Sequence, residues 1–313
     1  MPEHALSLVD IPAENRLFFG CRLRTSLLLT SLPATGESGP PDIELVRGTV
    51  APALDSPAWA SPFIEIAADG TALVRMKDNL RFLVFGGKHV VVDYADSVTP
   101  AEVETFFVSV VAGVLLHQRA AFTLHASAVV RDGKAVILSG VSGRGKSTLA
   151  TALIDDGWSF LTDDICRIDF TGTIPMVSPG AGRLRLWPDA LCALGRKPDD
   201  MASVRPGHPK KILEKAVCSL KPVPAFALIR LDSDLRQQVP RLELMTGPQA
   251  IFPIDVLVYR ARLARQLGRR LELFENLTRL AGSIPIYSLI RPEGKMDLPA
   301  LTAMVQSIVD KAE

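Results

Sequence analysis

A glycine-rich segment near the middle of the chain has the residue types that bind phosphate. Residues 140–148 read Gly-Val-Ser-Gly-Arg-Gly-Lys-Ser-Thr and match the pattern GxxxxGK[ST]. In this pattern the glycines let backbone N–H groups turn toward phosphate oxygens, the lysine reaches the β- and γ-phosphates, and the hydroxyl binds Mg²⁺. The loop therefore predicts that the chain binds ATP together with Mg²⁺. The residues expected to hold them are Gly140, Ser142, Gly143, Arg144, Gly145, Lys146, Ser147 and Thr148, with Ser147 on the metal.

Two adjacent carboxylates follow an apolar segment beyond this loop. Asp163 and Asp164 come directly after residues 159–162, Ser-Phe-Leu-Thr. Because neighbouring residues of a strand point to opposite faces, we expect the two carboxylates to do different jobs. One can hold Mg²⁺ while the other accepts the proton of an attacking hydroxyl, which is what phosphoryl transfer requires. A solvated acidic turn is the alternative interpretation.

The stretch from His125 to Asp164 resembles the core of HPr kinase/phosphorylase, a family related in fold to ATP-dependent phosphoenolpyruvate carboxykinase. Residues 125–128, His-Ala-Ser-Ala, the glycine-rich loop and the acidic pair occur in that family in this order and at very similar spacing. The resemblance implies that Asp163 is the general base, that Asp164 helps Ser147 to hold the metal, and that His125 stands beside the attacking oxygen. Without the resemblance, His125 would be read as a satisfied core histidine on an apolar strand.

The resemblance covers residues 120–190 and continues more loosely to the C-terminus. The glycine-rich signature that follows the acidic pair in true HPr kinases is replaced here by residues 179–188, and the first region does not resemble their N-terminal domain. The chain is more similar to HPr-kinase-like proteins found with peptide-modifying gene clusters, including kinases that phosphorylate a serine of lasso-peptide precursors. This similarity implies a protein or peptide substrate that bears a serine, and it makes a homo-oligomer possible.

Basic residues beyond the loop are further candidates for binding phosphate. In residues 183–187 the arginines and the tryptophan share one face if the chain is extended. Arg185, as a better candidate than Arg183, is then expected to stabilise charge on the transferring phosphoryl group. The alternative interpretation is that the segment is the edge of a surface strand. Lys210 and Lys211 either close over phosphates as a flap or are solvated.

Two other charged groups are ranked lower. Five arginines between 260 and 270 indicate the solvated face of a helix. Residues 226–232 resemble the apolar strand and aspartate of ordinary P-loop ATPases, but Arg230 interrupts the apolar pattern. Asp232 is therefore a weaker metal candidate than the acidic pair.

The elements around these residues alternate between strand and helix. Segments 122–130 and 134–139 are predicted strands joined at Asp132-Gly133, and a helix then runs from the loop to near Gly157. Further strands are expected at 158–162 and 225–231, and residues 255–281 are predicted to be mostly helical. The sequence predicts an α/β fold in which residues 99–313 form the P-loop kinase domain, of the type shared by HPr kinase and phosphoenolpyruvate carboxykinase.

The preceding region, residues 1–98, is predicted to be a β-rich N-terminal domain with a possible role in binding a substrate or peptide. Asp69-Gly70 and Gly86-Gly87 separate pairs of short apolar runs, which is typical of antiparallel hairpins. Residues 33–62 contain six prolines and are expected to be looped or edge-like. Thr99, Pro100 and Glu102 form the start signal of an amphipathic helix, and we expect the domain boundary there.

Composition and charge argue against several classes of partner, although a local basic patch could still bind a polyanion. A formal net charge of +1 gives no field that selects nucleic acid, and the four cysteines have neither disulfide-framework nor zinc-site spacing. The N-terminus lacks a signal-peptide pattern, and the longest apolar helical stretch, 106–116, is about half of what a membrane span needs. A cytoplasmic protein that binds neither nucleic acid nor membrane is expected.

The leading hypothesis is an ATP- and Mg²⁺-dependent kinase that transfers the γ-phosphate to a serine hydroxyl of a protein or peptide. A carboxykinase-like or small-molecule kinase is the first alternative. The second is a non-catalytic, ATP-dependent peptide-binding protein.

Overall fold

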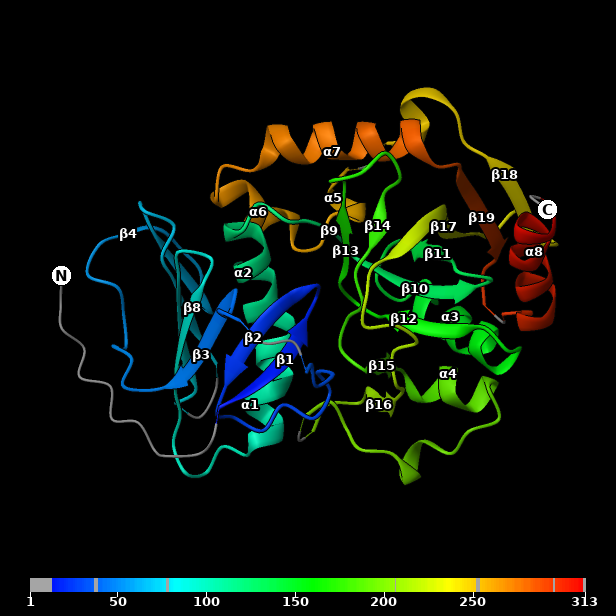
Figure 1. Cartoon of the computed structure of the whole chain (residues 1–313). Coiled ribbons are helices and arrows are strands. Elements are labelled where there is room, and N and C mark those ends of the chain that lie inside the picture. The colour runs from blue at the N-terminus through cyan, green and yellow to red at the C-terminus, as the bar shows by residue number, and fades with distance from the viewer. Residues whose placement is uncertain are drawn as a thin grey trace. The chain divides into compact units, whose positions relative to one another are not determined.

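The computed structural model describes residues 13–36, 39–76, 79–205, 207–251, 254–294 and 296–311. The chain divides into two compact units, each with a large β-sheet and helices (Figure 1). The first unit holds residues up to Phe122 together with Arg262–Arg270, and the second holds Thr123–Ala261 and Leu271–Glu313. The predicted α/β class is confirmed.

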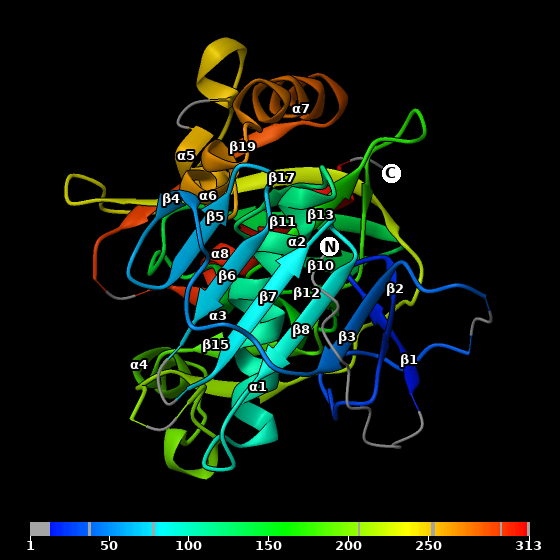
Figure 2. The same cartoon turned by 90° about the vertical axis from the view of Figure 1, so that its left-hand side faces the viewer.

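The first unit contains a sheet with the strand order β1-β2-β3-β8-β7-β6-β5-β4 (Figure 2). Both predicted hairpins are present, and Gly70, Gly86 and Gly87 all have the positive φ that their turns require. The strands are β1 (Glu14–Phe18), β2 (Cys21–Thr25), β3 (Ile43–Arg47), β4 (Pro57–Ala60), β5 (Ile64–Ala67), β6 (Ala72–Arg75), β7 (Arg81–Phe85) and β8 (His89–Asp93).

The proline-rich stretch 33–62 differs from its prediction in one respect. It contains β3, a central strand that pairs in parallel with both β2 and β8, so the sheet is not purely antiparallel. The prolines flank this strand and do not interrupt it, which leaves its N–H groups free to pair. The other strand of the stretch, β4, is an edge strand as expected.

A long helical segment follows the first sheet and belongs to the same unit. It consists of α1 (Pro100–Phe106), a π-helical turn η1 (Phe107–Val111) and α2 (Ala112–Gln118), and it begins with the predicted Thr99–Glu102 capping box. The Gln118 amide donates to the carbonyl of Gly70, in the turn between β5 and β6, over 2.8 Å and to that of Val84, in β7, over 3.0 Å. The division between the units therefore falls after this helix, whereas the sequence placed it before.

The same segment, Pro100–Gln118, is long and apolar enough to cross a membrane by length and composition. However, 72% of its most apolar window is buried inside the protein, which is the behaviour of a core helix. It gives no support for a membrane span.

The second unit is built on a nine-stranded sheet that includes the path β12-β10-β11-β17-β14-β13-β9, with β19 on β17 and β18 on β19. Strands β11, β17 and β19 run parallel, whereas β10 is antiparallel to β11 and to β12. These strands are β9 (Phe122–Leu124), β10 (Ala126–Arg131), β11 (Lys134–Ser139), β12 (Ser159–Thr162), β13 (Cys166–Asp169), β14 (Met176–Val177), β17 (Val223–Asp234), β18 (Arg241–Leu244) and β19 (Ile286–Pro292).

Two helices pack together on this sheet and form its core. Leu149 and Leu153 of α3 (Lys146–Asp155) and Leu301 and Val305 of α8 (Leu298–Asp310) lie in one buried cluster with side chains of β10, β11, β17 and β19. Figure 1 shows α8 beside α3. This packing fixes the start of α3, and with it the loop that precedes the helix.

A separate two-stranded ribbon completes the surroundings of the loop. Strand β15 (Arg183–Leu186) pairs with β16 (Lys211–Glu214) in antiparallel register, so Arg185 lies on extended chain, which is the condition that its expected role required. Between these strands lie the short helix α4 (Pro188–Ala193) and the turn η2 (Pro198–Asp200).

The predicted helix over 255–281 is divided in the structure. It consists of α5 (Ile254–Leu257), α6 (Ala261–Gln266) and α7 (Arg270–Ser283), and the turn η3 (Gly247–Ala250) precedes them. Arg260 has a φ of 49° and Gly268 a φ of 73°, values that end a right-handed helix. The five arginines therefore do not share one helical face.

Candidate active site

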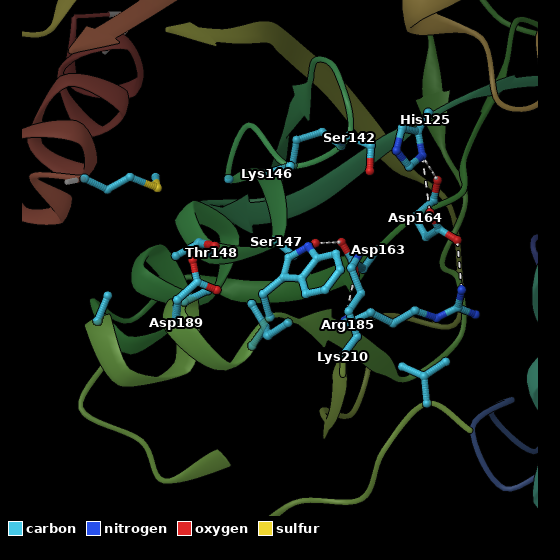
Figure 3. Close-up of a pocket in the computed structure, with 18 of the residues that line it drawn as sticks. His125, Ser142, Lys146, Ser147, Thr148, Asp163, Asp164, Arg185, Asp189 and Lys210 are labelled. Atoms are coloured by element: carbon cyan, nitrogen blue, oxygen red, sulfur yellow. Dashed lines mark hydrogen bonds and ion pairs between the residues drawn. The ribbon is translucent and has the colours of Figure 1, made fainter. Parts of the chain in front are cut away.

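A cavity of about 600 Å³ lies within the second unit (Figure 3). Its wall comes from the glycine-rich loop 140–145 and α3, from the residues after β12, from the ribbon β15–β16 with the segment between its strands, and from the segment after β19. Most of the residues proposed from the sequence meet here. They are His125, Ser142, Gly143, Gly145, Lys146, Ser147, Thr148, Asp163, Asp164 and Arg185.

The loop from β11 to α3 contains three glycines with positive φ, Gly140, Gly143 and Gly145. A Cβ on Gly140 would lie 2.4 Å from the carbonyl oxygen of Leu231 in β17, so only glycine lets the loop start this close to the sheet. Gly145 has a φ of 96° and precedes α3, whose first N–H groups have no side-chain cap. The N-terminus of this helix is therefore open to an anion.

The Lys146 side chain is buried at the base of the loop. Its ammonium donates to the carbonyls of Gly140 and Val141, over 2.9 and 3.3 Å. Burial lowers the pKa of Lys146, while the carboxylates of Asp163 and Asp164 act in the opposite direction. A buried ammonium held only by carbonyls is well suited to exchange them for phosphate oxygens.

Asp163 is the centre of a buried hydrogen-bond network. Its Oδ1 accepts from Ser127 Oγ at 2.6 Å and from Ser147 Oγ at 2.8 Å, and its Oδ2 accepts from the backbone N–H of Arg185 at 3.1 Å. Three donors on one carboxylate fix its orientation. Ser127, which is fully buried on β10, received no role from the sequence, although it belongs to the quoted His-Ala-Ser-Ala motif.

Asp164 faces different partners. Its Oδ1 lies 3.2 Å from His125 Nδ1, and its Oδ2 lies 3.2 Å from Arg185 Nη1. Burial by itself would raise the pKa of Asp164, but the hydrogen bond from His125 and the charges of Arg185 and Arg260 outweigh it and hold this pKa well below its ordinary value. The backbone of Asp164 has a φ of 70°, which is uncommon outside glycine and turns its carboxylate away from the side that Asp163 occupies.

His125 lies at a break in the predicted strand 122–130. The chain leaves β9 at Leu124 and enters β10 at Ala126, and between them the His125 N–H donates to the carbonyl of Leu257 at 2.7 Å. The imidazole is therefore fixed through its backbone and through Asp164. The centroid of the imidazole ring lies 6.0 Å from that of the Tyr259 ring. Tyr259 is buried, and burial raises the pKa of its phenol to about 12.

Two loop residues from the prediction do not line the cavity. Gly140 acts through backbone geometry, and the Arg144 guanidinium pairs with Asp232 (3.6 Å) and hydrogen-bonds Ser233, at the end of β17. Asp232 is thus paired with Arg144.

The groups around Ser147 fit a magnesium ion bound to a triphosphate. The hydroxyl of Ser147 and the carboxylate of Asp163 supply hard oxygen donors on one side of the cavity. Among the described residues no cluster of three or more His, Cys, Asp or Glu side chains could hold a metal ion alone. Mg²⁺ is commonly held by one or two protein oxygens plus substrate phosphates, so this sparse donor set suits it.

Known proteins resemble this chain in structure but not in sequence. Neither a family model nor a curated protein sequence matches the chain. Among solved structures, the chain is similar to the Hpr(Ser) kinase/phosphatase from Coxiella burnetii, at 14% sequence identity and a TM-score of 0.32. The match covers 61% of this chain and 95% of that one. A likeness at this TM-score supports no conclusion about function, so the proposals below depend on the contacts in the cavity.

Proposed function

We propose that the chain is an ATP- and Mg²⁺-dependent kinase that transfers the γ-phosphate to a serine hydroxyl of a protein or peptide. One observation carries this proposal most directly. The hydroxyl of the phosphate loop, Ser147, is hydrogen-bonded to the first carboxylate of the acidic pair, and the second carboxylate holds a histidine in the same cavity. A phosphate cradle, a metal site and a proton acceptor in one cavity are the parts that phosphoryl transfer needs.

The contacts favour a division of labour different from the one the sequence predicted. Asp163 shares its Oδ1 with Ser147, so we assign Asp163, with Ser147, to the metal side. Asp164 is engaged by two basic side chains and its low pKa makes it a weak base, so we assign it to orient His125. With Nδ1 of His125 bonded to Asp164, Nε2 is the atom that takes the proton of the attacking hydroxyl.

The reaction balances with these groups. The serine oxygen forms a bond to the γ-phosphorus, and the bond from that phosphorus to the β–γ bridging oxygen breaks, with its electron pair leaving on ADP. The hydroxyl proton passes to His125. Bound Mg²⁺ would neutralise charge on the phosphates, while Lys146, the loop N–H groups and Arg185 bind the phosphate oxygens and align them.

The experiment is to incubate the chain with ATP, MgCl₂ and a library of serine-containing peptides, and to identify phosphorylated products by mass spectrometry. We expect a single added phosphate on serine, its loss in Lys146→Met, and its retention in Lys221→Met, which changes an exposed lysine outside the cavity. Thermal unfolding of each variant checks that it is folded. Nucleotide binding without any phosphate transfer would overturn the kinase, and transfer only to small acids would overturn the peptide substrate.

A further inference from the structure

The segment between β15 and β16 brings a second lysine into the cavity. Lys210 lines the cavity with Lys146, Ser147 and Asp163, whereas the next residue, Lys211, turns its ammonium to Ser203 Oγ at 3.2 Å. In Figure 3, Lys146 enters above the hydrogen bond between Ser147 and Asp163, and Lys210 lies below it. A phosphoryl group at Ser147 would thus have one lysine on each side.

The ammonium of Lys210 makes a weak contact with an aromatic ring, which a phosphate group could replace. Its Nζ lies 5.2 Å from the centroid of the Trp187 ring, an indole that is 41% exposed and also lies 6.3 Å from the ring of His208. The Lys210 backbone N–H donates to His208 Nδ1 at 3.1 Å, which fixes the base of the side chain. A cation–π contact at an exposed site is weak, and phosphate oxygens attract an ammonium more strongly.

The charges around Lys210 call for an anion. Lys146, Arg185 and Arg291 line the same cavity as Lys210. Like charges are costly to gather in a cavity unless an anionic ligand offsets them. The cavity also holds three carboxylates: Asp163 and Asp164 already have partners in Ser127, Ser147, His125 and Arg185, and Asp189 is exposed to solvent.

We propose that Lys210 is a further catalytic residue, which leaves the face of Trp187 to bind the γ-phosphate opposite Lys146. The inference rests on the proposed function, because it needs a triphosphate in the phosphate loop. Lys210 forms and breaks no covalent bond in this role. It neutralises charge on the oxygens of the transferring group, a contribution that grows as the bond to ADP breaks.

The test compares the affinities of Mg²⁺-ADP and of Mg²⁺ with the non-hydrolysable ATP analogue AMPPNP, measured by calorimetry on the whole chain. We expect Lys210→Met to leave ADP affinity unchanged and to weaken AMPPNP by about 10-fold, while Lys211→Met changes neither. We also expect AMPPNP, but not ADP, to change the intrinsic fluorescence of the wild-type chain, and Trp187→Phe to abolish that change. In the transfer assay, Lys210→Met should lower kcat by about 10²-fold.

The outcomes separate this inference from the proposed function. If the wild-type chain binds neither nucleotide, the proposed function fails and Lys210 loses its role with it. If both nucleotides bind and the preference for AMPPNP is the same in Lys210→Met as in wild type, Lys210 does not contact the γ-phosphate and only this inference is overturned.

Discussion

Ser127 and Ser147 donate hydrogen bonds to the same atom, Oδ1 of Asp163, from two different elements of the fold. Ser127 lies on β10 and is fully buried, whereas Ser147 lies in the first turn of α3 and reaches the cavity. The buried hydroxyl of Ser127 therefore orients the same carboxylate, Asp163, to which Ser147 is hydrogen-bonded. This relationship links the core of the sheet to the proposed metal side of the cavity.

The first prediction concerns Ser127→Ala. Removing the buried donor leaves Asp163 held only by Ser147 and the Arg185 N–H, so its orientation is less well fixed. We therefore expect kcat to fall by about 10- to 100-fold, as for other groups that orient a metal ligand. The Mg²⁺ concentration needed for half-maximal rate should rise, which a purely structural role would not cause. Unfolding should become easier by about 1–2 kcal/mol because a buried hydrogen bond is lost. Ser178→Ala removes a buried hydroxyl away from the cavity, and an equal kinetic effect there would contradict the assignment.

The second prediction separates the two aspartates. Asp163→Asn should weaken Mg²⁺-dependent nucleotide binding by about 10-fold or more, because one metal-side oxygen becomes an amide. Asp164→Asn should leave nucleotide binding nearly intact and lower the transfer rate by about 10²–10⁴-fold, because His125 loses its orienting partner. Calorimetry and the peptide assay measure the two effects. If the pattern is reversed, the roles predicted from the sequence are the correct ones.

The third prediction compares the stability of alanine variants at two glycines, Gly140 and Gly157, which both have positive φ but differ in what surrounds them. Gly140→Ala should unfold more easily than wild type by several kcal/mol, on the order of 3, because its Cβ would meet the Leu231 carbonyl in addition to the strained φ. Gly157→Ala, at a φ of 92° with open space around the Cβ, should cost only about 1–2 kcal/mol. Chemical denaturation without nucleotide gives both values. Similar costs for the two variants would show that the loop can move away from β17.

The fourth prediction is a pH dependence of stability. In the folded chain, the contacts with His125 and Arg185 outweigh the effect of burial and hold the pKa of Asp164 below its unfolded value of about 3.9. The contacts of the ionised carboxylate therefore stabilise the folded state fully at a pH above about 3.9. This stabilisation is lost as the pH falls through the folded pKa. Asp164→Asn, which keeps a residue that tolerates positive φ, should therefore cost about 1–3 kcal/mol at pH 7, and the difference from wild type should shrink below about pH 4.

The control for this pH dependence is Asp189→Asn, which neutralises an exposed carboxylate of the same cavity. Its free energy of unfolding should parallel that of the wild type from pH 7 to pH 3. If the difference in the free energy of unfolding between wild type and Asp164→Asn stays constant from pH 7 to pH 3, the proposed role of the ion pairs is contradicted.

Local patterns in the sequence were sufficient for much of the fold. The hairpins at Gly70 and Gly86, the Thr99 cap and the strand–loop–helix around Lys146 depend on neighbouring residues, and the structure contains all of them. The parallel pairing of β3 was missed, because it depends on partners that are distant in sequence.

The site was predictable as a set of residues but not as a set of contacts. The break at His125 depends on a hydrogen bond to Leu257, which is distant in sequence. The division of roles between Asp163 and Asp164 depends on the positive φ of Asp164, which no local turn pattern predicted. Spacing can place two carboxylates after a strand, but it cannot tell which one faces the phosphate loop. Arg260 was read as part of a solvated helix, whereas its charge reaches Asp164 from a turn.

The most direct test of the account is a crystal structure of the chain with AMPPNP and Mn²⁺, in which anomalous scattering locates the metal. The account predicts the triphosphate in the loop 140–148 and Mn²⁺ bound to Ser147 Oγ on the Asp163 side, with His125 facing the γ-phosphate. A nucleotide bound elsewhere, or a metal on Asp164 with Asp163 turned away, would contradict it.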